Sequence, residues 1–79
     1  MNVKIYSTEW CSYCKNTKRF LDEKGIEFEE INIESKGMSR EDLEKITGGR
    51  TVPQIVIDGN PIGGYDDLLS LDSEGKLPG

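Results

Sequence analysis

The two cysteines of this chain, Cys11 and Cys14, are separated by only two residues, and this spacing limits how the chain can be held together. A disulfide between them would close too small a loop to stabilise the fold appreciably. Small secreted domains that depend on disulfides carry more cysteines at wider spacings. The 79 residues must therefore fold around a hydrophobic core, and their number favours a single domain covering residues 1–79. The cysteine pair is therefore better explained by a chemical role than by a structural one.

The charged residues exclude several classes of function. The chain has 10 basic and 15 acidic residues, a net charge of −5, and nucleic acids and anionic membranes repel an acidic chain. It contains no histidine, which excludes histidine-based catalytic triads and histidine-ligated metal sites. Its apolar runs are far shorter than the ~20 residues of a membrane span, and its N-terminus has a strand pattern in place of a signal peptide. We expect a cytoplasmic monomer that binds neither nucleic acid nor membrane.

Apolar periodicities separated by glycine and proline predict elements in the order β-α-β-α-β-β-α. The first two strands enclose a helix and should run parallel with a right-handed crossover, whereas Asp58-Gly59 predicts a hairpin between the last two. The third strand is almost entirely apolar, which favours an internal place, and a proline in the fourth favours an edge. The result is an α/β fold with a four-stranded mixed sheet flanked by three helices. The predicted strands cover residues 3–6, 26–33, 52–57 and 60–62, and the predicted helices run from Cys11 to Lys24, from Ser39 to Gly48, and from Gly64 to about Gly75.

The same patterns predict the spacing of residues on the helical faces, the burial of Leu43 and Ile46, and where one helix begins. In the second strand the alternation slips between Phe28 and Ile31, so the frame of that strand is left open. Ser39 with Asp42 matches a capping box, in which each side chain hydrogen-bonds to the backbone of the other residue. The predicted helical faces contain Tyr13, Thr17, Phe20, Leu21 and Lys24 in the first helix, Leu43 and Ile46 in the second, and Leu68, Leu69 and Leu71 in the third.

Cys11 and Cys14 stand where the first strand gives way to the first helix. Residues three apart share one helical face, and their Cα separation of roughly 5–6 Å suits a disulfide. At the helix N-terminus, free backbone N–H groups and the macrodipole stabilise a thiolate on Cys11, and Lys15, Lys18 and Arg19 add positive potential. Cys14 lies one turn further in and gains less, so Cys11 is predicted to attack and Cys14 to resolve. A zinc site is the structural alternative, but two cysteines without histidine leave it short of ligands.

Three short motifs occur in the order and at the separations of one known family. They are Trp10-Cys11-Ser12-Tyr13-Cys14, Thr51-Val52-Pro53 and Gly63-Gly64-Tyr65-Asp66-Asp67. On these motifs the chain resembles the glutaredoxin family, a branch of the thioredoxin-like fold, and the likeness covers nearly the whole chain. The resemblance implies a dithiol glutaredoxin, an oxidoreductase that uses glutathione as co-substrate to reduce protein–glutathione mixed disulfides and protein disulfides. Its expected partners are glutathione and such proteins, with ribonucleotide reductase among the substrates known in the family.

The resemblance also implies a glutathione site. The Val52–Pro53 bond is expected to be cis, so that Pro53 faces the dithiol and the Val52 backbone pairs with the cysteinyl part of glutathione. The region of Tyr65 and Asp66 holds the γ-glutamyl end, whose ammonium group Asp66 takes. From the residues alone, Asp66 and Asp67 can equally be explained as helix-capping residues. The expected glutathione-binding residues are Tyr13, Arg50, Thr51, Val52, Pro53, Gly64, Tyr65 and Asp66.

At one position of the glutathione site the chain departs from the family. A family lysine that meets the glycyl carboxylate of glutathione is replaced by Thr8. Because glutathione is anionic and this chain is acidic, another cation must offset the lost charge. The best candidate is Arg50, for which a solvated loop charge is the alternative explanation. The further candidates are Lys15, then Lys36 and Arg40.

A second departure is Ser12, at a position where proline is commonest in the family. Some members with serine there hold a [2Fe-2S] cluster between two protomers through the first cysteine and glutathione. A cluster carrier with Cys11 as its ligand is therefore one alternative function. Another is a glutaredoxin-like hydrogen donor for ribonucleotide reductase that takes electrons from thioredoxin reductase. Thr8 favours this second alternative, and the motif at residues 63–67 argues against it.

Overall fold

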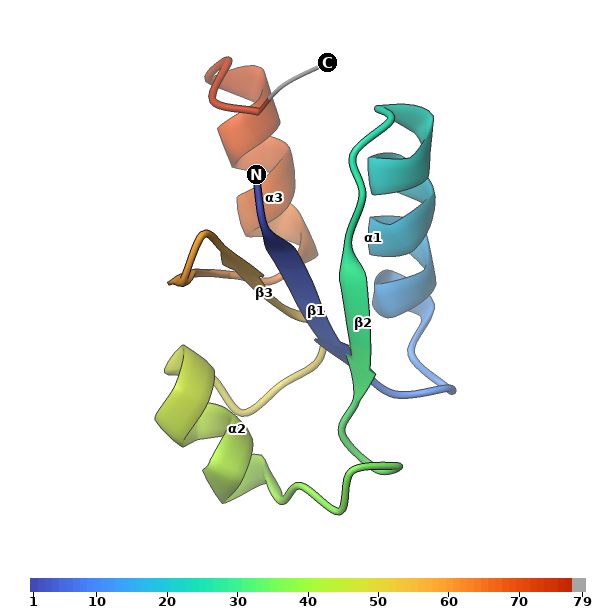
Figure 1. Ribbon diagram of the computed structural model, residues 1–79, viewed down its shortest axis with the longest axis vertical. Coiled ribbons are helices and arrows are strands. Elements are labelled where there is room, and N and C mark those ends of the chain that lie inside the picture. Colours follow the sequence, from blue (N-terminus) through green and yellow to red (C-terminus); the bar gives the residue numbers. More distant parts are fainter. Residues whose placement is uncertain (78–79) are drawn as a thin grey trace.

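Four strands in the computed structural model, which describes residues 1–77, pair into one mixed sheet in the order β2-β1-β3-β4 (Figure 1). The elements follow one another in the predicted order, and the α/β fold class is confirmed. The strands are β1 (Val3–Ser7), β2 (Glu29–Asn32), β3 (Gln54–Ile57) and β4 (Asn60–Gly63). The helices are α1 (Ser12–Glu23), α2 (Arg40–Thr47) and α3 (Tyr65–Ser73).

The sheet combines parallel and antiparallel pairs, as predicted. β1 runs parallel to β2, from which α1 separates it in sequence, and antiparallel to β3. β3 and β4 form the predicted hairpin, in which the turn residues Asp58 and Gly59 have φ angles of 51° and 82°. Positive φ at both central residues is typical of a two-residue hairpin turn that matches the twist of the strands. β3 lies inside the sheet and β4, which carries Pro61, lies at an edge, so both predicted places are confirmed.

Residues on the two faces of the sheet build two hydrophobic clusters, which makes the sheet the middle of three layers. The cluster under α1 and α3 contains Val3, Ile5, Leu21, Ile26, Ile55 and Leu68. The cluster under α2 contains Tyr6, Ile33, Leu43 and Val56. Figure 1 shows α2 well apart from the other two helices. Each fully buried Leu or Ile side chain stabilises the fold by about 1.5–3 kcal/mol, and together they anchor β1 and β3 from both sides.

The buried faces of the helices differ from the prediction at single positions. Tyr13, which shares the helical spacing of the predicted face, is 61% exposed, and the neighbouring Cys14 is fully buried. Ile46 is 47% exposed, and Thr47 is buried instead, with its hydroxyl donating to a helix carbonyl at 2.9 Å. Leu69 also lies partly at the surface. A small side chain that satisfies its polar group within the helix can be buried at little cost, so periodicity read from apolar residues alone misplaces these faces.

The second strand is shorter than predicted because its first residues belong to the end of α1. Gly25 has a φ of +71°, and its N–H donates to the Asp22 carbonyl at 3.0 Å. The N–H of Ile26 donates to the Leu21 carbonyl at 2.9 Å. These two bonds form a Schellman motif, which ends a helix and packs the next apolar residue against it. Ile26 therefore belongs to the helix terminus and Phe28 also precedes β2, so the alternation slips where the strand begins.

Candidate active site

The N-terminus of α1 holds both cysteines. Cys11 is the N-cap residue, with φ −87° and ψ 112°, and its Sγ accepts a hydrogen bond from the Cys14 N–H at 3.1 Å. The sulfur takes the place of the side-chain oxygen that usually caps a helix, where the positive end of the helix dipole acts on it. Both residues are free thiols and both are buried. The pair therefore stands at the strand–helix junction that the sequence predicts.

Cys14 lies in surroundings that oppose its ionisation. Burial and, next, a side-chain hydrogen bond with Cys11 raise the pKa of the Cys14 thiol from 9.0 to about 12. A backbone hydrogen bond from Thr8 and the positive charge of Lys18 lower this pKa but are outweighed. Cys14 is therefore protonated at neutral pH, which agrees with the expectation that this cysteine keeps its proton.

The Val52–Pro53 peptide bond is cis and lies against the dithiol, as the resemblance implied. The Cys11 thiol donates a hydrogen bond to the Val52 carbonyl oxygen, 3.5 Å from Sγ. The pairing of β1 with β3 explains this proximity, because Tyr6 at the end of β1 is paired with Gln54 at the start of β3. The loop that follows β1 and the loop that precedes β3 therefore meet at one end of the sheet.

A groove of about 650 Å³ opens beside this contact. It lies between α1, the loop from α2 to β3, and the junction of β4 with α3. Its lining residues are Tyr13, Thr47, Gly48, Gly49, Thr51, Val52, Pro53, Gln54, Gly63, Gly64, Tyr65, Asp66 and Asp67. The fold thus brings together every residue expected to bind glutathione except Arg50.

Six of the lining residues are outside the expected glutathione-binding set. Gly63 and Asp67 belong to the third motif, whereas no site role was predicted for Thr47, Gly48, Gly49 and Gln54. The Gly48-Gly49 pair was interpreted only as the end of a helix, and Gly48 does close α2 in a left-handed conformation with φ +83°. A side chain at Gly49 would collide with the buried Gln54 side chain. The second glycine is therefore needed for close approach of the two segments, and the doubled glycine was the available signal.

The far end of the groove is the N-terminus of α3. Gly64 is the N-cap residue, and the Asp67 carboxylate accepts a hydrogen bond from its N–H at 2.9 Å, so the capping explanation of Asp67 is confirmed. The N–H groups of the first turn have no acceptor within the helix, and the exposed carboxylate of Asp66 lies beside them. Backbone donors and a carboxylate at one place suit a zwitterionic group. The ring of Tyr65 lies 6.3 Å from that of Tyr13 across the groove.

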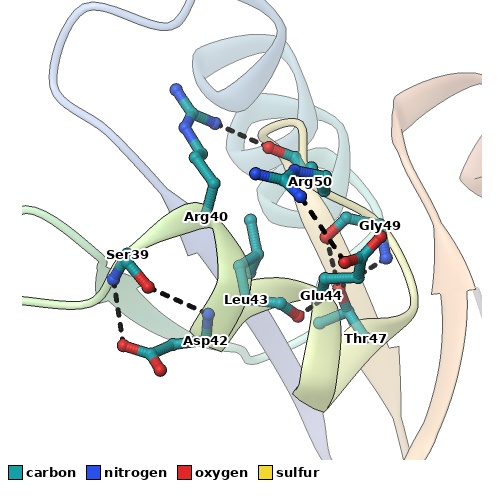
Figure 2. Close-up of polar contacts among 8 residues, drawn as sticks. All are labelled: Ser39, Arg40, Asp42, Leu43, Glu44, Thr47, Gly49 and Arg50. Carbon is teal, nitrogen blue, oxygen red and sulfur yellow. Dashed lines mark hydrogen bonds and ion pairs between the residues drawn. The ribbon is translucent and has the colours of Figure 1, made fainter.

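Two arginines, Arg40 at the start of α2 and Arg50 in the loop after it, lie outside this groove. Figure 2 shows the Arg50 guanidinium turned toward Glu44, and 3.7 Å separates its Nη1 from the carboxylate. The Arg50 carbonyl accepts a hydrogen bond from Arg40 Nη1 at 3.0 Å (Figure 2). The Arg40 guanidinium also lies 5.9 Å from the centre of the Trp10 ring. A second hollow of about 340 Å³ is lined by Trp10, Arg40, Arg50, Thr51 and Val52.

Thr8, at the position of the family lysine, is buried, and within residues 1–77 its hydroxyl has no hydrogen-bond partner. Neither Lys15 nor Lys36 lines the groove. No helix in the described part of the chain is both long and apolar enough to cross a membrane. Among the same residues, no group of three or more cysteine or carboxylate side chains gathers where it could hold a metal ion.

Comparison with known proteins gives one consistent family. The family model described as Glutaredoxin matches residues 3–62. The chain is 47% identical over 76 residues to Glutaredoxin 3 of Escherichia coli (strain K12), which covers 96% of this chain and 92% of that protein. It is 45% identical over 75 residues to a glutaredoxin of Pseudomonas aeruginosa, which covers 95% of this chain and 89% of that protein.

Solved structures agree with this family. A crystal structure of a buckwheat glutaredoxin–glutathione complex superposes with a TM-score of 0.84 at 30% identity, covering 95% of this chain and 71% of that one. The NMR structure of oxidised Escherichia coli glutaredoxin superposes with a TM-score of 0.82 at 30% identity, covering 94% and 95% of the two chains. Both the order of the strands and the helices around them therefore correspond to a thioredoxin-like fold.

Proposed function

This chain belongs to the glutaredoxin family and is a thiol-disulfide oxidoreductase, and we propose that glutathione is its co-substrate. The proposed reactions are the reduction of protein–glutathione mixed disulfides and of protein disulfides. The observation that carries the proposal is the 3.5 Å contact between Cys11 Sγ and the Val52 carbonyl, beside a groove of about 650 Å³ that Val52 also lines. The glutathione complex of the buckwheat relative supports the assignment.

The chemistry of the groove matches the parts of glutathione in order. The Val52 backbone lies beside Cys11 and suits the cysteinyl unit, whose sulfur must reach the attacking thiol. At the other end, the N–H groups at the start of α3 suit the γ-glutamyl carboxylate, and Asp66 suits its ammonium group. Tyr13 and Tyr65 flank the space between these two ends.

Arg40 is the residue best placed to receive the glycyl carboxylate. The hollow lined by Arg40 and Arg50 shares Thr51 and Val52 with the glutathione groove, so it adjoins the position proposed for the cysteinyl unit. Arg50, the candidate favoured by the sequence, directs its guanidinium to Glu44. The hydrogen bond to the Arg50 carbonyl and the Trp10 ring hold the Arg40 guanidinium beside this hollow. We therefore propose that the Arg40 guanidinium supplies the positive charge that is missing at Thr8.

For a mixed disulfide, the proposed reaction uses Cys11 alone. Its thiolate attacks the glutathione sulfur, a bond forms between Cys11 and glutathione, and the protein sulfur leaves as a thiolate that takes up a proton. The thiolate of a second glutathione then attacks the glutathione sulfur bound to Cys11. Glutathione disulfide is released, and Cys11 returns to its reduced form.

For a protein disulfide, the proposed reaction uses both cysteines. Cys11 attacks one sulfur of the disulfide, and the other sulfur leaves. Cys14 then attacks Cys11, which releases the second protein thiol and leaves a disulfide between Cys11 and Cys14. Because the two sulfurs lie within one helical turn, this intramolecular attack needs little chain movement. Two glutathione molecules restore the dithiol.

The proposal is tested by following NADPH consumption with a glutathionylated peptide as substrate. One sample contains glutathione and glutathione reductase, and a parallel sample contains thioredoxin reductase alone. Turnover in the glutathione sample only is the expected result. Turnover with thioredoxin reductase only would contradict the proposal and favour the hydrogen-donor alternative. A visible absorption band after anaerobic reconstitution with iron, sulfide and glutathione would instead favour the cluster carrier.

A further inference from the structure

This inference rests on the dithiol route proposed above. In that route Cys14 must lose its proton, although its burial opposes ionisation. Cys14 is 0% exposed and protonated at neutral pH, yet a thiol must become a thiolate to attack a disulfide. Some feature of the protein must therefore favour negative charge on this sulfur while it attacks.

Cys14 belongs to a ring of groups that are joined by helical spacing, an ion pair and hydrogen bonds. Lys18 lies four residues further along α1, on the same side of the helix, and its Nζ is 2.7 Å from Oε2 of Glu30 on β2. The same oxygen accepts a hydrogen bond from the hydroxyl of Ser7, 2.8 Å away at the end of β1. Ser7 is fully buried, and the backbone of the next residue, Thr8, is hydrogen-bonded to Cys14. The ring connects α1, β1 and β2 around the buried thiol.

Lys18 supplies the positive charge in this ring. The charged or titratable groups that act on the Cys14 sulfur are Cys11 and Lys18, both on α1. The hydrogen bond from Lys18 and, less strongly, that from Ser7 lower the pKa of Glu30, so Glu30 is ionised at neutral pH. Its negative charge opposes that of Lys18. Through the ion pair, Glu30 therefore offsets part of the positive potential that Lys18 places near Cys14.

We propose that Lys18, held in place by Glu30, is a positioning residue for the resolving step of the reaction. In this step Cys14 gives its proton to solvent and its sulfur attacks the Cys11 sulfur. A bond between the two cysteines forms as the bond from Cys11 to the substrate sulfur breaks. The leaving thiolate takes a proton from solvent. Lys18 stabilises the negative charge on Cys14, and Glu30 limits that effect, so the pair sets how readily the dithiol route competes with release by a second glutathione.

The test isolates the resolving step in a single turnover. Reduced protein is mixed with a glutathionylated peptide without free glutathione, and mass spectrometry after acid quenching follows the Cys11–glutathione adduct as it becomes the Cys11–Cys14 disulfide. Lys18→Met is expected to slow this conversion and Glu30→Gln to accelerate it, because the two changes remove opposite charges. The double variant is expected to stay close to the wild-type rate.

The expected change in the rate of the resolving step follows from two opposing effects of pKa on a thiolate nucleophile. A pKa change of one unit alters the thiolate fraction tenfold, and the greater nucleophilicity of a more basic thiolate offsets part of this, which leaves about a threefold change in rate. The pH midpoint of the conversion should move up in Lys18→Met and down in Glu30→Gln. A purely mechanical role of the ion pair would not move the two midpoints in opposite directions.

Two further variants complete the experiment. Lys18→Arg keeps the charge and should convert at the wild-type rate, and Lys45→Met removes an exposed lysine from α2 and serves as the matched control. Equal slowing by Lys18→Met and Glu30→Gln, or unchanged rates in both, overturns the proposal. The amplitude of adduct formation, which depends on Cys11, reports separately on the proposed function, so a wild-type protein that forms no adduct contradicts that function instead.

Discussion

Replacing one cysteine at a time should separate the two reactions at the scale of single residues. Cys14→Ser is expected to retain reduction of mixed disulfides and to lose reduction of protein disulfides, because only the second reaction needs an internal nucleophile. Cys11→Ser is expected to lose both, since the remaining thiol is 0% exposed. The measurement is turnover with a glutathionylated peptide and with insulin. Full activity of Cys11→Ser toward the peptide would refute the assignment of the attacking cysteine.

Two neighbouring carboxylates at the start of α3 should respond to substitution in different ways. Asp66→Ala is expected to raise the KM for glutathione about tenfold, because the loss of a hydrogen bond to a charged group costs about 1.5 kcal/mol. Asp67→Ala should instead lower the free energy of unfolding by about 1 kcal/mol, because its carboxylate caps the helix through the Gly64 N–H. Steady-state kinetics and urea unfolding of both variants check this. A raised KM in Asp67→Ala and a lower stability in Asp66→Ala would contradict these assignments.

The two arginines near Val52 offer a matched comparison. Arg40→Leu is expected to raise the KM for glutathione about tenfold, because it removes a charged hydrogen bond to the glycyl carboxylate. Arg50→Leu should change this KM less than twofold, since its guanidinium pairs with the exposed Glu44 at 3.7 Å, and exposed pairs contribute little. Kinetics with glutathione at fixed ionic strength decide between them. A larger effect for Arg50→Leu would instead support Arg50, the candidate favoured by the sequence, as the cation that binds the glycyl carboxylate.

Site residues differed in how well the sequence could place them, and the reason is the length of the side chain. Cys11, Val52 and Gly64 act close to the backbone, so the motif that fixes the backbone also fixes their position. Arginine has several rotatable bonds, and its direction depends on partners from other elements. Arg50 turns to Glu44 and Arg40 to Trp10, and neither pairing has a local signal in the sequence.

At the scale of elements, the start of α2 gives a direct test of a local signal. Ser39 Oγ accepts a hydrogen bond from the Asp42 N–H, and the Asp42 carboxylate accepts one from the Ser39 N–H, both at 3.1 Å. The predicted capping box is therefore confirmed. Ser39→Ala is expected to lower the free energy of unfolding by about 1 kcal/mol, and Ser39→Asp, which keeps an acceptor, to change it less. Urea unfolding measures both, and equal losses would contradict the capping role.

The order and pairing of the elements were predictable because their signals are local. A helix cap, a turn dipeptide such as Asp58-Gly59, or a stretch of alternating residues acts over a few positions. The faces of the helices were less predictable, because they depend on what packs against them. Cys14 is buried in the first turn of α1, and Ile26 is buried because a Schellman motif folds it back on α1. Neither burial is visible in apolar periodicity.

At the scale of the whole molecule, the position of the site depends on two hydrophobic clusters that pack against opposite faces of the sheet. The cluster that includes Ile5 and Ile55 lies under α1 and α3, and the cluster that includes Tyr6 and Val56 lies under α2. β1 and β3 contribute to both, so the loops that leave them are held at one end of the sheet. This explains why motifs far apart in the sequence form one groove. From the sequence, only the resemblance to a whole family indicated that these motifs lie close together in space.

Cys14 also links the chemistry of the site to the stability of the whole molecule. Its pKa is raised from 9.0 to about 12 in the folded protein, so the folded state binds this proton more tightly than the unfolded state does. The stabilisation is complete below pH 9 and is lost as the pH rises toward 12, at up to about 1.4 kcal/mol per pH unit. The reduced wild-type protein should therefore lose stability over this range faster than Cys14→Ser.

Urea unfolding at pH 7, 9 and 10.5 under reducing conditions measures this difference. Every other ionisable side chain is present in both proteins, so the comparison isolates the contribution of Cys14. Because burial is the largest cause of the shift, the gap between the proteins should be near constant from pH 7 to 9 and should change by more than 1 kcal/mol by pH 10.5, an estimate from the same linkage relation. Parallel curves would mean that water reaches the thiol, and a thiol open to water would need no help from Lys18 to resolve the adduct on Cys11.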